Sequence, residues 1–381
     1  MKIGIMTFWW SENNYGQLLQ CFALQKYLRD MGHDVYLIQY DQRYDFIKLP
    51  LWKKALKGFN PAGLYKYLLY KKLKNKSNRE QWDNPRYFED FRNKYIKQSE
   101  NIYYSYKELV KNPPAADMYI AGSDQIWNTF GLPINRAKNV LMAYMLNFGD
   151  PFIKRISYAA SFGREKIDND FEKEFSPLLK NFNYVSVREK SGLDICEQCG
   201  IDNAEWVPDP TMLLDVNIYQ ELYKDEQIIK QDKPYCFLYL VGNEFNQSIK
   251  VIYKWAEKKD IVVVYVTGNN RHDKYIKTYA KIHEWIYLLE HAEYIITNSY
   301  HCSVFALLFK KKFCIIPKNR VNYGDTRFDS FFELFNLEKR YINSDFSALD
   351  KDINWQSVSS TFKIIKKSCK LNDVINCMSV K

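Results

Sequence analysis

The chain has 381 residues, and its 46% hydrophobic and 26% charged content is that of an ordinary soluble globular protein with one large or two smaller domains. The formal net charge of +10 equals the charge of the ten Lys and Arg residues between 48 and 79, a stretch without Asp or Glu. No run approaches the ~20 apolar residues that span a bilayer. The first residues also lack the pattern of a signal peptide, so we expect a cytoplasmic protein.

The first forty residues predict a strand, a helix and a second strand. Residues 2–8 and 35–40 have the composition of buried strands, and residues 17–31 place apolar side chains at helical spacing. Asn14 and Gly16 lie in the polar turn before the helix. This pattern opens a Rossmann-like sheet, but the G-x-G-x-x-G fingerprint is missing, so dinucleotide binding is not indicated.

The basic stretch 48–79 mixes its cations with large apolar residues, among them Trp52, Phe59 and Tyr65. Such a mixture is typical of a segment that lies on anionic lipid. A solvated pair of basic helices and a nucleic-acid patch are the alternatives. Because no nucleic-acid-binding motif accompanies the segment, we predict a peripheral membrane contact at the inner face and no nucleic-acid partner.

Alternating strands and helices continue along the chain and predict parallel sheets with crossover helices. The predicted elements after the basic stretch are helices near 86–97, 105–111, 246–258, 279–291, 302–310 and 354–368, and strands near 118–121, 155–160, 184–187, 235–241, 261–266, 293–297 and 313–316. We expect an N-terminal Rossmann-like domain over 1–225 with the insertion 45–80, a second over 226–350, and a C-terminal helix in 351–381 that packs back on the first.

Polar loops follow most of these strands, at 11–16, 122–128, 161–163, 188–190, 242–244, 267–270 and 298–301. In open parallel sheets the ligand binds beside the loops at the carboxyl ends of the strands. Two such sheets facing each other would form a cleft lined by these loops.

The loop before residue 302 carries the clearest chemical signal. His301 lies where a strand passes into a helix, a point that collects free N–H groups and the positive end of the helix dipole. Such a place suits a phosphate or carboxylate, and a histidine there can move a proton. A packed histidine at a helix start is the structural alternative.

Metal binding is not indicated by the cysteines. Cys196 and Cys199 form a lone C-x-x-C inside a predicted helix, and no second Cys or His pair accompanies them at zinc spacing. We expect no metal and no cofactor.

Five segments in register resemble the polysaccharide pyruvyl transferase family. They are Asn14-Tyr15-Gly16, Ala121-Gly122-Ser123-Asp124-Gln125-Ile126-Trp127-Asn128, Ser186-Val187-Arg188-Glu189, Pro208-Asp209-Pro210-Thr211 and Ser299-Tyr300-His301. The resemblance implies two Rossmann-like domains facing across a cleft, as in GT-B glycosyltransferases. It also implies transfer of pyruvate from phosphoenolpyruvate (PEP), as a donor substrate, to sugar hydroxyls of cell-surface glycans, often as a cyclic ketal.

The family holds PEP with an arginine, a histidine and a second basic residue. Arg188 and His301 match the first two, and Arg327 is our choice for the third, with Lys318 and Arg320 as alternatives. The arginine usual two residues before the histidine is replaced here by Ser299, so the carboxylate must be held differently.

The remaining candidates serve the sugar or the helix start. Asp124 is suited to orienting or activating a sugar hydroxyl, although it can equally cap its own turn. The other predicted substrate contacts are Asn298, Ser299, Asn14, Gly16, Ser123, Gln125 and Trp127. Trp127 fits a core position as well as a sugar platform.

These features together predict a transferase that pyruvylates a lipid-linked glycan precursor, with a 4,6-ketal on a hexose such as galactose as the family-level expectation. A nucleotide-sugar glycosyltransferase on the same fold is one alternative. A non-catalytic protein that binds a membrane surface is the other.

Overall fold

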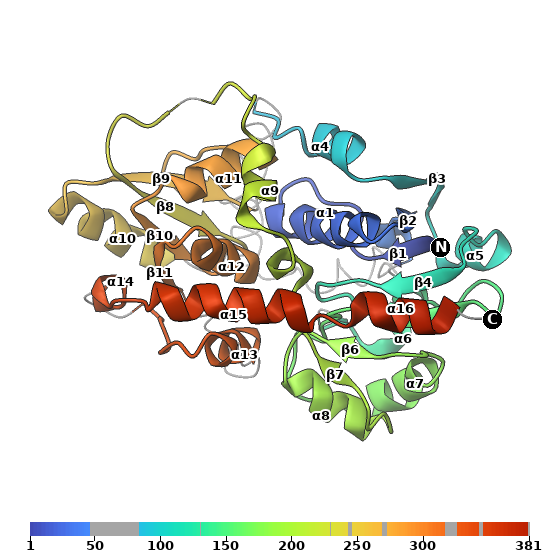
Figure 1. The fold of residues 1–381 in the computed structure, drawn as a ribbon. Helices are drawn as coiled ribbons and strands as arrows, with labels where there is room; N and C mark the ends of the chain where they lie inside the picture. Colours follow the sequence, from blue (N-terminus) through green and yellow to red (C-terminus); the bar gives the residue numbers. More distant parts are fainter. Residues whose placement is uncertain are drawn as a thin grey trace, which may run out of the picture.

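The computed structural model describes residues 1–45, 84–129, 131–228, 230–242, 246–268, 273–316, 326–342 and 346–379. The predicted membrane segment 48–79 lies outside these residues. Two parallel sheets form the framework (Figure 1), one built from strands before residue 158 and the other from strands after residue 234. The prediction of two Rossmann-like α/β units with parallel sheets is therefore confirmed.

The first sheet has the order β3-β2-β1-β4-β5, and all four pairings are parallel. Its strands are β1 (Lys2–Met6), β2 (Asp34–Tyr40), β3 (Gln98–Tyr103), β4 (Met118–Ala121) and β5 (Lys154–Ser157). A short parallel pair, β6 (Ser186–Val187) and β7 (Glu205–Trp206), continues beyond β5 through bridges from Ile156 to Tyr184 and from Ala160 to Val187. The loops after β4, β5 and β6 therefore open at one edge.

The second sheet has the order β11-β10-β8-β9 and is also parallel throughout. Its strands are β8 (Tyr235–Leu240), β9 (Val262–Thr267), β10 (Tyr294–Thr297) and β11 (Lys312–Ile315). Every residue of β8 is buried. Burial on both faces of a strand is expected where helices cover both sides of a parallel sheet.

Helices cover the sheets of both domains (Figure 1). In the first domain they are α1 (Tyr15–Asp30), α4 (Phe88–Tyr95), α5 (Tyr106–Lys111), α6 (Ile134–Tyr144), α7 (Asn169–Leu179), α8 (Ser191–Gln198) and α9 (Val216–Glu221), with short 3-10 turns at Gln42–Tyr44 (η1) and Pro210–Met212 (η2). In the second they are α10 (Asn246–Lys258), α11 (Ile282–Glu290), α12 (Tyr300–Leu308), α13 (Thr326–Leu334) and α14 (Ser347–Asp350).

The chain ends in two consecutive helices, α15 (Trp355–Ser368) and α16 (Leu371–Ser379), which cross from the second domain to the first (Figure 1). Asn372 Oδ1 lies 3.2 Å from His33 Nε2, and Cys369 Sγ lies 3.8 Å from the Tyr158 hydroxyl. Both contacts join the C-terminal segment to the first domain.

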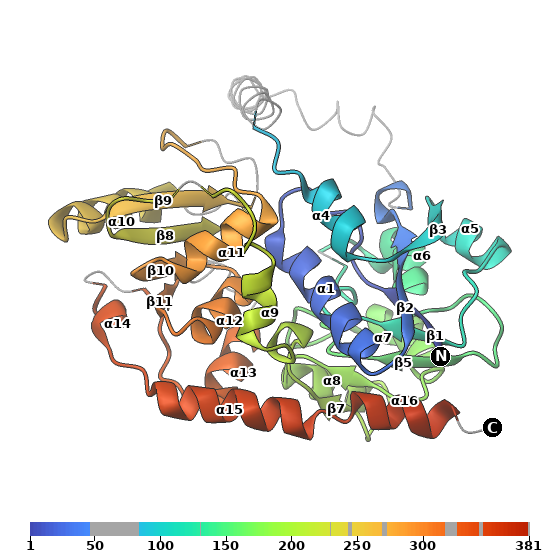
Figure 2. The same ribbon diagram turned by 45° about the horizontal axis from the view of Figure 1, so that its top comes forward.

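An apolar seam joins the two domains beside α1, which lies next to α12 and α9 in both views (Figures 1 and 2). The Tyr15 ring stacks on Trp285 with centroids 5.3 Å apart, and its hydroxyl donates to the carbonyl of Ala280 at 2.6 Å. Further along, Tyr219 meets Phe305 edge to face at 4.8 Å. This packing fixes the first turn of α1 against the second domain.

Candidate active site

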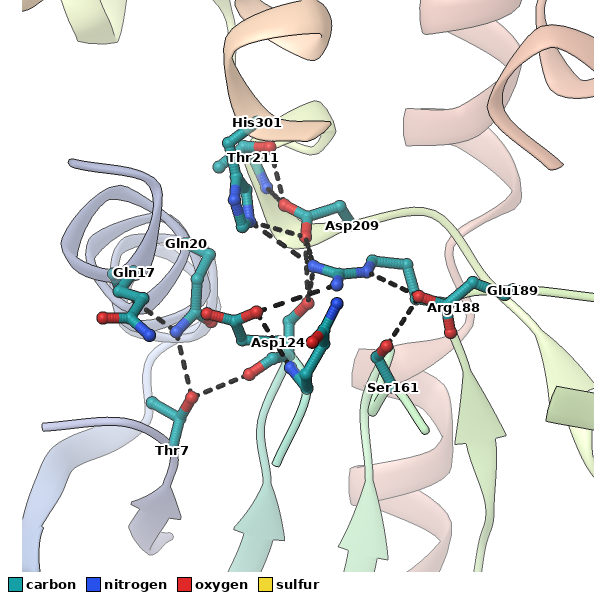
Figure 3. Close-up of polar contacts among 12 residues, drawn as sticks. Thr7, Gln17, Gln20, Asp124, Ser161, Arg188, Glu189, Asp209, Thr211 and His301 are labelled. Atoms are coloured by element: carbon teal, nitrogen blue, oxygen red, sulfur yellow. Dashed lines mark hydrogen bonds and ion pairs between the residues drawn. The ribbon is translucent and has the colours of Figure 1, made fainter. Parts of the chain in front are cut away.

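Arg188 follows β6 and is the centre of a polar cluster between the domains (Figure 3). It is only 2% exposed, and its Nη1 donates to Asp209 Oδ2 at 2.8 Å. Its Nε lies 3.4 Å from Glu189 Oε1, and Nη2 lies 3.8 Å from Asp124 Oδ1. Burial alone would lower the pKa of Arg188, but Glu189, Asp209 and Asp124 outweigh it, so the pKa is raised and the charge is held.

Asp209 joins the arginine to the histidine. Its Oδ1 accepts from the backbone N–H and the hydroxyl of Thr211, at 3.0 and 2.6 Å, which fixes the turn that starts η2. Its Oδ2 accepts from Arg188 and from the Ser123 hydroxyl at 2.9 Å, and it lies 3.2 Å from His301 Nε2. Burial would raise the pKa of Asp209, but His301, Arg188 and Thr211 hold it well below the usual range of a carboxyl.

His301 is the second residue of α12, whose start is capped by the Ser299 hydroxyl accepting from the Cys302 N–H. Its Nε2 faces Asp209 and also lies 3.4 Å from Arg188 Nη1. An Nε2–H directed to the carboxylate leaves Nδ1 as the free ring nitrogen. On that side the ring meets Gly16, because a Cβ built there would lie only 2.3 Å from Nδ1.

Asp124 completes the cluster from the loop after β4. It has a positive φ of 84°, and its Oδ1 accepts from the Gln125 N–H at 2.8 Å. Its Oδ2 is buried without a hydrogen-bond partner among the described residues, and so is Nη2 of Arg188. One acceptor and one cationic donor of this cluster therefore lack a hydrogen bond among the described residues.

The sequence model of the family described as Polysaccharide pyruvyl transferase matches residues 14–318. The chain belongs to this family. The match spans Gly16, Asp124, Arg188, Asp209 and His301, so the cluster is contained within the region that defines a pyruvyl transferase of this kind. No curated protein matches the chain.

Solved structures resemble the chain only at low identity. The UDP-GlcNAc 2-epimerase of Methanocaldococcus jannaschii, in complex with UDP-GlcNAc and UDP, is 14% identical over 97% of this chain and 100% of its own, with a TM-score of 0.46. The Neisseria meningitidis UDP-GlcNAc 2-epimerase is 11% identical over 96% and 99%, with a TM-score of 0.41. The glycosyltransferase SsfS6 of Streptomyces sp. SF2575 is 10% identical over 96% and 99%, with a TM-score of 0.37.

The predicted third basic residue of this pyruvyl transferase, Arg327, lies near the cluster at the start of α13. When the Gln125 amide is turned so that its oxygen faces Arg327, that oxygen accepts from Nε at 3.3 Å and from Nη1 at 2.9 Å. Because Gln125 follows Asp124 directly, this contact brings Arg327 to the same loop. The alternatives Lys318 and Arg320 lie outside the described residues.

Other predicted substrate contacts have structural partners instead. The Asn298 amide bridges both backbone groups of Val241, at 2.8 and 2.7 Å, and so ties the end of β10 to the end of β8. Ser123 donates to Asp209. Asn14 occupies the N-cap position of α1, although its side chain makes no capping bond, and Gly16 provides the close approach to His301.

Trp127 is a core residue, which corrects its prediction as a sugar platform. It is 0% exposed, packs among Phe162, Phe175 and Phe182, and lies with its Nε1 3.4 Å from the carbonyl of Tyr144. Neither face of the ring is open to a sugar.

Three members of the cluster were not predicted as site residues. Asp209 lies in a motif that the sequence singled out without a role, and only the fold shows that it joins Arg188 to His301. The Tyr300 ring lies beneath Arg188, with the guanidinium carbon 4.7 Å from its centroid. Glu189 accepts from the Ser161 hydroxyl at 2.6 Å and so links two of the polar loops.

Two further searches cover only the described part of the chain. There, no three His, Cys, Asp or Glu side chains are grouped as metal ligands would be. Over the same residues, no helix combines the length and the hydrophobicity that a bilayer crossing requires.

Proposed function

We propose that this pyruvyl transferase uses PEP as donor and places pyruvate on a pair of hydroxyls of a sugar acceptor, as a cyclic ketal. One observation supports this most directly. A buried cationic donor, Arg188 Nη2, and a buried acceptor, Asp124 Oδ2, both lack hydrogen-bond partners among the described residues, and Nη1 of the same arginine lies 3.4 Å from His301 Nε2. An anion and a hydroxyl are the groups that would satisfy them.

In this proposal the anionic groups of PEP bind between Arg188 and Arg327. Arg188 supplies a guanidinium whose charge burial does not remove, and such a group binds carboxylate or phosphate strongly. The N-terminus of α12 adds N–H groups and a favourable dipole. The family usually has an arginine two residues before the histidine, and this chain has Ser299 there. We therefore assign the second anionic group of PEP to Arg327.

The reaction then needs one proton transfer to carbon. A sugar hydroxyl oxygen attacks C2 of PEP while a proton is delivered to the C3 methylene, which becomes the methyl group of the product. A second hydroxyl of the same sugar then attacks C2, and the bond from C2 to the phosphate oxygen breaks. The products are the cyclic ketal and inorganic phosphate, and the two hydroxyl protons leave with the base and the phosphate.

His301 and Asp124 divide the proton chemistry. Asp209 accepts the Nε2–H of His301 and so orients the ring, which makes Nδ1 the nitrogen that would carry the proton for C3. Because Gly16 has no side chain, the start of α1 can pack this closely against the Nδ1 side of the ring without displacing it from Asp209. Asp124 accepts from the attacking hydroxyl through its unpaired Oδ2.

The acceptor in this proposal is a lipid-linked precursor of a cell-surface polysaccharide. The cations and aromatic residues between 48 and 79 would hold the enzyme at the inner membrane face, where such a precursor is exposed. Neutralising the lysines of this segment should lower binding to anionic liposomes while turnover of a soluble acceptor continues. Unchanged partitioning into the liposome fraction would contradict the membrane contact.

Two measurements test the donor. PEP should raise the melting temperature of the protein, whereas UDP and GDP should not, and the reverse result would favour a nucleotide-sugar glycosyltransferase. Phosphate release from PEP should require the acceptor and should be abolished in His301→Ala with little loss of stability. If the pyruvylation of cellular glycans were unchanged in cells that carry His301→Ala, the alternative of a non-catalytic binding protein would gain support.

A further inference from the structure

A second buried arginine lies across the first turn of α1 from His301. Arg86 is 3% exposed, yet its Nε and Nη1 have no hydrogen-bond partner among the described residues. Its Nη2 donates to the carbonyl of Thr267 at the end of β9 at 3.0 Å, and its guanidinium carbon lies 4.8 Å from the Tyr279 ring centroid. A buried cation without a carboxylate partner is unfavourable unless something else compensates it.

Structural arginines in this chain are satisfied differently. Arg155 is also buried, but its Nε donates to the carbonyl of Leu146, its Nη1 to that of Ile153 and its Nη2 to that of Phe148, at 2.6 to 2.8 Å. Arg86 instead resembles Arg188, whose Nη2 is unpaired at the candidate active site. Unpaired guanidinium nitrogens therefore mark Arg86 as a candidate ligand-binding group.

A second unpaired group lies in the same region. The Tyr239 hydroxyl, at the end of β8, is buried and has no partner among the described residues. A Cβ built on Gly268 would lie 3.0 Å from that hydroxyl and 3.4 Å from the carbonyl of Asn13. Because Gly268 follows Thr267, the partner of Arg86, the two unsatisfied side chains belong to one region at the carboxyl ends of β8 and β9.

The start of α1 also favours a negative charge in this region. This helix has 16 residues and no acidic side chain in its first turn, so the positive end of its dipole is not neutralised there. Arg86 also acts on Tyr15, the first residue of α1, because its charge offsets part of the burial that raises the pKa of that hydroxyl. Arg86 and the Tyr239 hydroxyl can both donate to an anion in this region, whereas the carbonyl oxygens of Asn13 and Thr267 beside them are acceptors.

We propose that Arg86, Tyr239 and the start of α1 form a second anion subsite, which binds the phosphate or diphosphate carried by the sugar acceptor. This inference rests on the proposed pyruvyl transfer. Asn13 borders the subsite and Gly16 contacts His301, and three peptide units between them span at most ~11 Å. A sugar bound between the two points would have its anionic group at Arg86 and its reacting hydroxyls near His301.

Titration of inorganic pyrophosphate tests the subsite directly. Wild-type protein should bind it with PEP present, and Arg86→Met should weaken that binding about ten- to a hundredfold, as expected when hydrogen bonds to a charged group are lost. Arg86→Lys keeps the charge and should retain part of the affinity. Equal affinity for pyrophosphate in wild type and Arg86→Met would overturn the proposal.

Stability separates a binding residue from a structural one. Arg86→Met should leave the melting temperature unchanged or raise it, because an uncompensated buried charge is removed. The matched control Arg155→Met should lower the melting temperature and leave pyrophosphate affinity unchanged. A large loss of stability in both Arg86→Met and Arg86→Lys would show that Arg86 is structural and overturn the inference.

Further measurements identify the group attached to the diphosphate and test the subsite separately from the proposed donor. Farnesyl diphosphate carries the same diphosphate on a lipid group, so it should bind and compete with pyrophosphate, whereas UDP should not, in keeping with a lipid-linked acceptor. Failure of farnesyl diphosphate and of pyrophosphate to bind would contradict the subsite. PEP should still raise the melting temperature of Arg86→Met. If wild-type protein bound pyrophosphate but did not bind PEP, only the proposed donor would be refuted.

Discussion

Placing a methyl group on Gly16 tests how the two domains position the histidine. The added Cβ would lie 2.3 Å from Nδ1, 2.5 Å from Cγ and 2.7 Å from Cβ of His301. The imidazole is 6% exposed and tied to Asp209, so it has little room to yield, and α1 must move away from α12 or the ring must leave the carboxylate. We expect a displacement on the order of 1 Å, which costs about a hundredfold in turnover.

The effect on stability should be much smaller than the effect on rate. Overpacking costs about 1–3 kcal/mol of unfolding free energy, and the higher helix propensity of Ala returns up to about 1 kcal/mol. Gly16→Ala should therefore melt only a few degrees lower while PEP-dependent phosphate release falls sharply. Lys26→Ala places the same residue at a partly exposed position of α1 and removes only a surface ion pair with Asp30, so it should change neither quantity measurably. Full activity in Gly16→Ala would refute the reasoning that contact with α1 holds His301 in place.

Three further changes follow from the cluster. Asp209→Asn removes the closest partner of buried Arg188 and should lower the free energy of unfolding by about 3–5 kcal/mol in urea at pH 7. The folded pKa of Asp209 lies below its unfolded value of about 3.9, so the carboxylate contributes its full stability above pH 3.9 and loses it as the pH falls toward the folded pKa. The difference in unfolding free energy between Asp209→Asn and wild type should therefore be smaller at pH 3 than at pH 7. A difference that stays constant between these pH values would contradict the assignment. Arg188→Lys keeps the positive charge but cannot donate from two nitrogens at once, so the affinity for PEP measured by titration should fall about tenfold or more. A near-wild-type affinity would argue against direct contact between Arg188 and PEP. Trp127→Phe should lower the melting temperature without changing KM for the sugar acceptor, and a selective rise in that KM would restore the sugar-platform interpretation.

The strong periodic segments were predictable because local sequence determines them. The helix expected at 17–31 is α1, and the four strands expected after residue 234 are β8 to β11, each within two residues of its predicted ends. β3 was missed because its sequence Gln-Ser-Glu-Asn-Ile-Tyr is polar, as an edge strand permits. An edge strand lacks the buried faces that give a strand its apolar pattern.

The candidate site was partly predictable for a different reason. Parallel sheets bring the loops after their strands to one edge, so Arg188 and His301 could be expected to meet although 113 positions separate them. The role of Asp209 could not be expected, because a Pro-Asp-Pro turn is an ordinary start of a helix and its second oxygen acquires partners only through the tertiary fold. Nor could periodicity show that the ring of Trp127 is covered on both sides.

The charges of the cluster indicate that Arg188 alone would not hold the proposed donor. Among the described residues, Arg188 lies within 4 Å of three carboxylates, those of Asp124, Glu189 and Asp209, so with a neutral histidine the cluster carries a net charge of about −2. A dianion would be repelled by that arrangement. Binding PEP there requires further positive charge, which Arg327, the starts of α1 and α12, and a proton on His301 can supply together. In the proposed reaction the same proton is consumed at C3, so recognition of the donor and readiness for the chemical step would depend on one protonation event.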